Sequence, residues 1–96
     1  MRAFHLIYTS EAKLRIRQLH PVLKSLIRLA LDSLQADPWA GKALQKELTG
    51  LRSLRVKHFR VLYRVAEEEK QIEILTLGAR KTIYEDFALK SNLASR

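Results

Sequence analysis

The chain has 96 residues, of which 47% are apolar and 29% are charged, so it is long enough for one hydrophobic core and too short for two, and we expect a single domain over residues 1–96. Eighteen lysines and arginines against 10 aspartates and glutamates leave a formal net charge of +8, which indicates a polyanionic partner, with nucleic acid as the first candidate. The chain has no cysteine and only three scattered histidines, which excludes disulfides and cysteine nucleophiles and predicts neither a metal site nor a cofactor.

The first third of the chain predicts a strand followed by a helical hairpin. Within residues 3–9, β-favouring apolar side chains recur at every second position, which is typical of a short strand. Ser10 offers an N-cap hydroxyl for a helix over residues 11–19. Pro21 suits the first turn of a second helix over residues 21–36. The apolar stripe expected on the second helix consists of Leu23, Leu26, Ile27, Ala30, Leu31 and Leu34.

A loop separates this hairpin from the rest of the chain. Asp37 and Pro38 end the second helix, because the residue before a proline avoids the α region. The loop is expected to run to Gly50. A lone tryptophan beside a proline is expected to cap the end of the core, although Trp39 could instead stack on a nucleic-acid base.

The second half of the chain changes to a period of two and predicts a sheet. Three strands are expected, near residues 53–57, 59–66 and 71–77. Gly78 closes the last strand, and residues 81–89 are expected to form a short C-terminal helix. The order of these elements predicts an α+β fold, in which a small antiparallel-rich sheet packs on an N-terminal helical hairpin.

The positive charge concentrates in the first two strands of this predicted sheet. Residues 48–66 contain no acidic residue. Strand alternation places Phe59, Val61, Tyr63 and Val65 on the core face. The opposite face then carries Ser53, Arg55, Lys57, Arg60 and Arg64. A sheet face this basic is suited to bind an anion.

The two strands predict a hairpin with paired arginines. If Lys57 and His58 form a two-residue turn, Arg55 lies directly opposite Arg60. Two guanidiniums held together suggest a phosphate site, since each offers bidentate donors that stay charged at any working pH. The charge pattern alone is more typical of solvated arginines on an exposed face. Likewise, Tyr84 could present its hydroxyl to a phosphate or pack in the core.

Motifs of common enzyme classes are missing from the chain. There is no glycine-rich phosphate loop, no nucleophile elbow, no HExxH pattern and no pair of carboxylates in the basic region. Ordinary hydrolase and kinase chemistry therefore has no support in the sequence.

Three segments, in this order, resemble the RelE/ParE toxin superfamily. They read DPWAGKALQKELTGL, LRVKHFRVLYRV and IEILTLGARKTIYE, and the resemblance spans nearly the whole chain. It implies a RelE-like fold of the microbial ribonuclease type and a toxin of a type II toxin–antitoxin system. The RelE branch of the superfamily cuts messenger RNA in the ribosomal A site, whereas the ParE branch inhibits DNA gyrase.

The resemblance to the RelE branch implies a metal-independent endoribonuclease, in which basic side chains neutralise the scissile phosphate while the RNA 2′-hydroxyl attacks it. The catalytic residues implied by position are Arg55, Arg60, Arg80 and Tyr84. Further RNA contacts are expected from Arg52, Lys57, His58, Arg64 and Lys81. Some members carry two lysines on the first hairpin strand, where this chain has Ser53 and Arg55, so Lys57 or His58 is the candidate proton acceptor.

The sequence leaves three functions open. The first, favoured by the implied catalytic set, is a ribosome-dependent endoribonuclease of RelE type. The second is a gyrase-binding toxin of ParE type, and the third is a basic module that binds nucleic acid without cleaving it.

The partners expected for the favoured function are a cognate antitoxin that folds on binding and mRNA on the ribosome. No apolar run approaches the ~18 to 20 residues of a membrane span, and the N-terminal residues lack the apolar stretch of a signal peptide. We therefore expect a cytoplasmic protein without a membrane partner.

Overall fold

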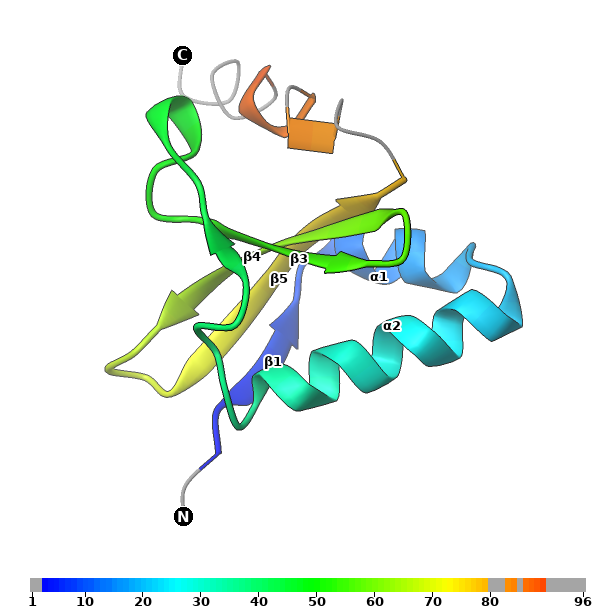
Figure 1. Ribbon diagram of the computed structural model, residues 1–96, viewed down its shortest axis with the longest axis horizontal. Helices are drawn as coiled ribbons and strands as arrows, with labels where there is room; N and C mark the ends of the chain where they lie inside the picture. Colours follow the sequence, from blue (N-terminus) through cyan, green and yellow to red (C-terminus); the bar gives the residue numbers. More distant parts are fainter. Residues whose placement is uncertain (1–2, 80–82, 85, 90–96) are drawn as a thin grey trace.

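The computed structural model describes residues 3–79, 83–84 and 86–89. Up to residue 79 these ranges contain a strand, two consecutive α-helices, a two-residue strand, a short 3-10 helix (η1) and three further strands (Figure 1). Their bounds are β1 (His5–Tyr8), α1 (Ser10–Arg17), α2 (Pro21–Leu34), β2 (Lys42–Ala43), η1 (Lys46–Leu48), β3 (Arg52–Val56), β4 (Phe59–Ala66) and β5 (Gln71–Gly78). Residues 83–84 and 86–89 are helical, in agreement with the predicted C-terminal helix, whose other residues lie outside the described ones.

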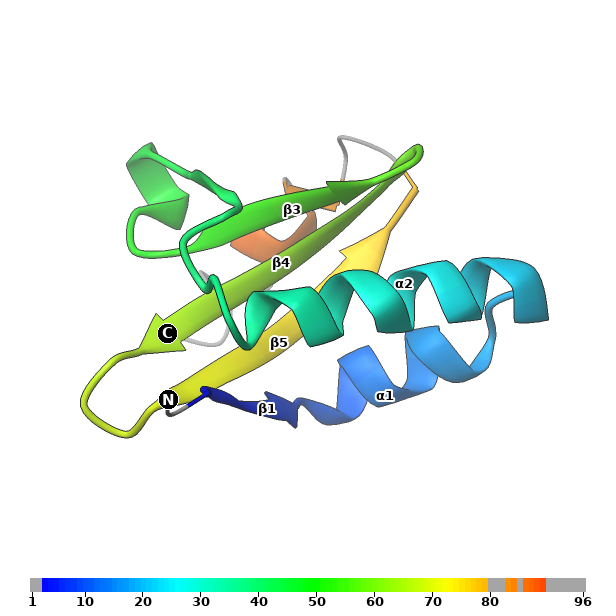
Figure 2. The ribbon, with the colours of Figure 1, turned by 60° about the horizontal axis from the view of Figure 1, so that its bottom comes forward.

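The five strands form one sheet in the order β1-β5-β4-β3-β2. β1 pairs with β5 in parallel, and the other neighbours are antiparallel. The helices α1 and α2 lie together against one face of the sheet, and the C-terminal helical residues lie over the other (Figures 1 and 2). The predicted α+β fold is confirmed. The two-residue strand β2, inside the predicted loop, was not expected.

The main core lies between the sheet and the helical hairpin. Ile27, Leu31 and Leu34 of the predicted stripe on α2 are buried there. They pack with sheet residues such as Val61 and Tyr63, which are fully buried. This burial confirms the predicted core face of the hairpin of β3 and β4 at Val61 and Tyr63.

The opposite face of the sheet is also partly buried. Leu62 and Thr76 are fully buried there, and Ile83 of the C-terminal helical residues is 4% exposed. A bulge between Leu62 and Tyr63 shifts the pairing of β4 with β5, and such an irregularity locally increases the twist of a strand. The face that carries the predicted basic residues is therefore covered along its middle and open at its ends.

The first helix begins one residue earlier than the sequence suggested. Thr9, not Ser10, is the N-cap: its backbone is extended and its hydroxyl accepts a hydrogen bond from the amide of Ala12 at 3.0 Å. The same hydroxyl donates to the carbonyl of Leu75 in β5 at 2.7 Å. This second contact, with a residue 66 positions away in the chain, favours Thr9 over its neighbour Ser10 as the N-cap.

None of the helices in the described ranges has the length and hydropathy that a membrane-spanning segment requires.

Candidate functional site

The β3–β4 hairpin has the predicted turn and register. Lys57 and His58 form the turn, Val56 pairs with Phe59, and Arg55 lies directly opposite Arg60. Lys57 adopts a φ of 56°, a conformation that non-glycine residues adopt uncommonly. The turn therefore holds two guanidinium-bearing side chains next to each other on the sheet face that is turned away from α1 and α2.

These two arginines have no carboxylate partner among the described residues, whose ion pairs involve other side chains. Arg55 is exposed, and its Nε donates to the carbonyl of Lys57 at 3.0 Å. Arg60 is half-buried, and its neighbour on β5 is Gly78, which has no side chain to place beside it. The pair is thus an anchored cationic site, because the carbonyl contact satisfies one donor without neutralising the charge.

Tyr84 lies beside this pair. The guanidinium carbon of Arg60 is 5.9 Å from the centroid of the Tyr84 ring, within the range of a cation–π contact. The hydroxyl of Tyr84 is 2.5 Å from Oγ of Ser53, which is 7% exposed. Tyr84 is half-buried and its hydroxyl lies on the basic face, so its contact with a phosphate stays a prediction.

Ser53 is the residue whose contact the sequence did not reveal. Strand alternation places it on the basic face, but this placement indicates no partner for its hydroxyl. The one available signal was its position two residues before Arg55, which puts both side chains on the same face. Its contact with Tyr84 bridges 31 residues of sequence.

Two of the arginines predicted to contact RNA also contact protein groups. Arg64 lies on the basic face but forms an ion pair with Glu73 on β5, so the strand carries less free charge than expected. Arg52 pairs with Tyr63 and therefore belongs to the opposite, helix-covered face. Its guanidinium donates to the carbonyls of Gly41 and Trp39.

The remaining predicted residues divide into two groups. Lys57 and His58 are exposed at the turn, close in sequence to the arginine pair, and the His58 ring lies 5.0 Å from that of Phe59. Arg80 and Lys81 lie outside the described residues.

The loop before β2 is tied to the sheet by a buried tyrosine. The Tyr63 hydroxyl donates to the carbonyl of Pro38 at 2.8 Å and accepts from the amide of Gly41 at 2.9 Å. Burial raises the pKa of Tyr63 above its ordinary value, although its hydrogen bond with Gly41 acts in the opposite direction. Trp39, at the tip of this loop, is 47% exposed. The expectation that it caps the core is wrong, because nearly half of its surface is exposed.

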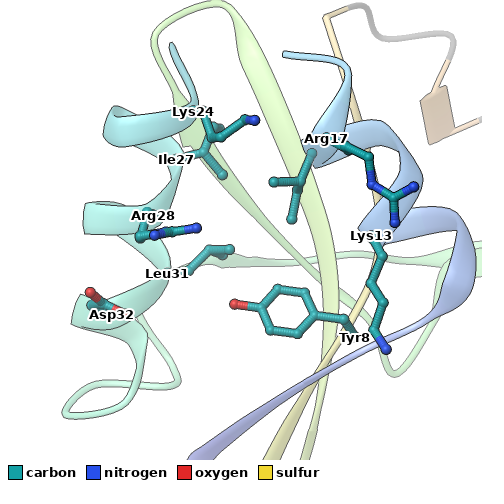
Figure 3. Close-up of a pocket in the computed structure, with 9 residues that line it drawn as sticks. Tyr8, Lys13, Arg17, Lys24, Ile27, Arg28, Leu31 and Asp32 are labelled. Atoms are coloured by element: carbon teal, nitrogen blue, oxygen red, sulfur yellow. The ribbon is translucent and has the colours of Figure 1, made fainter. Parts of the chain in front are cut away.

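A separate hollow of about 500 Å³ lies between α1 and α2 (Figure 3). Its lining consists of Tyr8, Lys13, Ile16, Arg17, Lys24, Ile27, Arg28, Leu31 and Asp32. Burial, reinforced by Asp32, raises the pKa of Tyr8 above its ordinary value. The hollow is on the helix side of the sheet and is therefore distinct from the arginine pair.

Comparison with known proteins shows which family the chain is similar to. Residues 6–84 match the family model of the ParE toxin of the type II toxin–antitoxin system parDE. Toxin RelG of Mycobacterium tuberculosis is 33% identical over 79 residues, which cover 80% of this chain and 91% of that protein.

Solved structures of toxins are similar as well. A chain of the M. tuberculosis toxin–antitoxin complex RelBE2 aligns with a TM-score of 0.73 at 30% identity, over 81% of this chain and 99% of that one. A mutant of the Escherichia coli toxin RelE in the free state aligns with a TM-score of 0.75 at 18% identity, over 93% of this chain and 97% of that one. At that identity the likeness to RelE concerns the fold alone.

Proposed function

Because this chain belongs to the RelE/ParE superfamily of type II toxin–antitoxin toxins, we propose that it is a RelE-type endoribonuclease that cleaves mRNA in the ribosomal A site. Structures of toxin–antitoxin complexes among its relatives support a cognate antitoxin as its partner. The single observation that carries the proposal is the cluster of Arg55, Arg60 and Tyr84, in which two adjacent guanidiniums lack a carboxylate partner among the described residues.

The reaction has one displacement at phosphorus. The 2′-hydroxyl of the nucleotide before the cut loses its proton to a base, and its oxygen forms a bond to the phosphorus. The bond from phosphorus to the 5′ oxygen breaks, and that oxygen takes up a proton. The products are a 2′,3′-cyclic phosphate and a 5′-hydroxyl, and the step needs no metal.

The arginine pair is suited to the charge that develops in this step. Negative charge grows on the phosphate oxygens and on the departing 5′ oxygen, and fixed cations aimed at it lower the barrier. Arg60 is anchored against Tyr84, so it is assigned to the phosphate oxygens. Arg55, exposed on the opposite strand, is assigned to the phosphate or to the leaving oxygen.

Proton transfer is assigned to the turn. An arginine is a poor proton acceptor, and the strand positions that carry lysines in some relatives hold Ser53 and Arg55 here. Lys57 and His58 are exposed beside the arginine pair and are the candidates for the base. A site with so few acid–base groups benefits from a scaffold that positions the substrate. This favours cleavage on the ribosome, which would supply that scaffold.

One observation favours a second function. The family model that matches residues 6–84 is that of the ParE toxin, so inhibition of DNA gyrase is the alternative. In that case the arginine pair would have no catalytic role. A gyrase supercoiling assay with the purified chain tests this alternative directly.

The deciding experiment is primer extension on a translated message in a purified translation system, with and without the chain. We expect cuts only when the message is translated. The substitution Arg60→Ala is expected to lower the cleavage rate about 100-fold, the typical loss when one donor to a developing oxyanion is removed.

The matched control is Arg28→Ala, which removes the same charge from an exposed position on α2, away from the arginine pair. We expect this variant to cleave at the unmodified rate. If the message stays intact while supercoiling by gyrase is inhibited, the nuclease proposal is wrong and gyrase inhibition takes its place.

A further inference from the structure

The loop that carries Trp39 is held more rigidly than its exposure suggests. Tyr63 bridges the carbonyl of Pro38 and the amide of Gly41 from below. Arg52 donates to the carbonyls of Trp39 and Gly41 at 3.0 and 2.7 Å. The backbone passes so close to Tyr63 that a Cβ atom on Gly41 would overlap its hydroxyl oxygen. Side chains of β3 and β4 thus hold this short loop at both ends.

This rigid loop presents one large exposed side chain. Trp39 is 47% exposed, although the indole is among the largest apolar groups in the chain. The guanidinium carbon of Arg52 lies 5.4 Å from the centroid of its ring. The indole is therefore oriented before any ligand arrives, and little conformational entropy is left to lose on binding.

The charge around this indole matches an anionic ligand. Arg52 lies against the ring and carries a charge that no carboxylate of the described residues pairs with. Apart from Asp37, residues 37–46 contain no acidic residue. Proteins bind the bases and phosphates of single-stranded nucleic acid with aromatic rings that have a guanidinium beside them.

We propose that Trp39 is a stacking platform for an unpaired RNA base, with Arg52 beside it for the adjoining phosphate. The proposal rests on the RNA substrate proposed above and deepens it. Arg52 and Arg55 are three positions apart on β3, about 10 Å along the strand, and on opposite faces of the sheet. The platform therefore takes a nucleotide away from the cleaved bond and contributes to binding, not to chemistry.

The experiment uses Trp39 as its own reporter, because it is the chain's single tryptophan. The probe is a single-stranded RNA oligonucleotide with 2′-O-methyl groups, which cannot be cleaved and so makes the measurement independent of activity. We expect the oligonucleotide to quench Trp39 emission on binding. A base-free phosphodiester of the same length is expected to bind without comparable quenching.

Substitutions separate stacking from charge in the same titration, followed by the anisotropy of a labelled oligonucleotide. Trp39→Ala is expected to weaken binding about tenfold, within the usual range for one stacked base, and Trp39→Phe to retain most of the affinity. The control Leu29→Ala truncates another exposed apolar side chain, on α2, and is expected to leave affinity unchanged.

Several results would overturn the platform. The platform is wrong if the oligonucleotide does not bind, binds without quenching Trp39 emission, or quenches it no more than the base-free polymer does. It is also wrong if Trp39→Ala binds the oligonucleotide with unchanged affinity, or if only a protein partner quenches the emission. The proposed function can fail independently of the platform. If the oligonucleotide quenches Trp39 but translated mRNA is not cleaved, the nuclease function is wrong and the platform stands. If translated mRNA is cleaved but Trp39 is not quenched, the nuclease function stands and the platform is wrong.

Discussion

Tyr63 shows how one buried polar group can organise a loop. Its ring is fully buried in the core, while its hydroxyl joins the carbonyl of Pro38 to the amide of Gly41. A buried donor or acceptor is costly when it lacks a partner. The hydroxyl therefore couples the position of the loop to the packing of the sheet.

We expect Tyr63→Phe to lower the free energy of unfolding by about 1–3 kcal/mol, because the amide of Gly41 and the carbonyl of Pro38 would lose a buried partner. Urea denaturation followed by circular dichroism measures this change. Tyr84→Phe is the comparison, since its hydroxyl is only part-buried. A loss no larger for Tyr63→Phe than for Tyr84→Phe would contradict this account.

The raised pKa of Tyr63 also predicts a pH dependence. The folded chain holds this proton more tightly than the unfolded chain, whose tyrosines titrate near their ordinary pKa of 10.0. Its contribution to stability is therefore complete below pH 10 and is lost as the pH rises through the folded pKa. Above pH 10, stability should fall more steeply for the unmodified chain than for Tyr63→Phe. Tyr8, whose pKa is also raised, affects both chains alike.

Ser53 is expected to orient Tyr84 for the proposed reaction. Its hydroxyl lies 2.5 Å from that of Tyr84, and such a bond contributes about 0.5–1.5 kcal/mol. Ser53→Ala should therefore lower the single-turnover cleavage rate by roughly 2- to 13-fold. Tyr84→Phe removes the same bond, so the double variant should be no slower than the slower single variant. Multiplying losses in the double variant would show that the two hydroxyls act independently.

At the scale of elements, the β3–β4 hairpin places like charges directly opposite each other. Arg55 and Arg60 face each other across the two strands, an arrangement that costs stability. Arg64, further along β4, has Glu73 as its partner. On the same face of the hairpin, the charge of Arg64 is therefore paired with a carboxylate, whereas Arg55 and Arg60 face each other.

We expect Arg55→Gln to raise the free energy of unfolding by about 0.2–1 kcal/mol, because it relieves this repulsion. The gain should shrink at high salt, which screens exposed charges. Arg64→Gln is the matched control and should bring no gain, since it breaks an ion pair. Thermal unfolding at low and high salt measures both. Equal gains in the two variants would indicate a general effect of net charge instead.

On the scale of the whole molecule, the sheet separates two surfaces. The helical hairpin covers one face (Figure 2), and the register of β3 and β4 places the arginine pair on the other. Because the net charge is +8, RNA binding should weaken as salt rises, through release of counterions from the phosphates.

The slope of this salt dependence counts the phosphates contacted. Arg60→Ala is expected to reduce the slope of log affinity against log salt concentration by about 0.7, the value for one single-strand phosphate. Binding of the uncleavable oligonucleotide at several salt concentrations measures it. Arg28→Ala, on the helix side, should leave the slope unchanged. An equal reduction in both variants would mean that RNA is held by the overall charge and not by the arginine pair.

Much of the fold could be predicted from the sequence, because its signals are local. The turn at Lys57 and His58 sets the register of the hairpin, and the alternation of side chains on β4 sorts its two faces. The stripe on α2 likewise identifies the helix and its buried side. Pairing of β1 with β5 and the short strand β2 could not be predicted, since each depends on segments that meet only after the chain has folded.

The sequence by itself determined the order of the elements, the hairpin that sets Arg55 against Arg60, and the excess of positive charge. Only the tertiary structure decided which arginines remain without a carboxylate partner in the described part of the chain, that Ser53 contacts Tyr84, and that Trp39 stays exposed. Turns and periodicity arise from neighbours in the sequence. The contacts that decided the site join residues 9 to 31 positions apart, and packing of the whole chain brings them together.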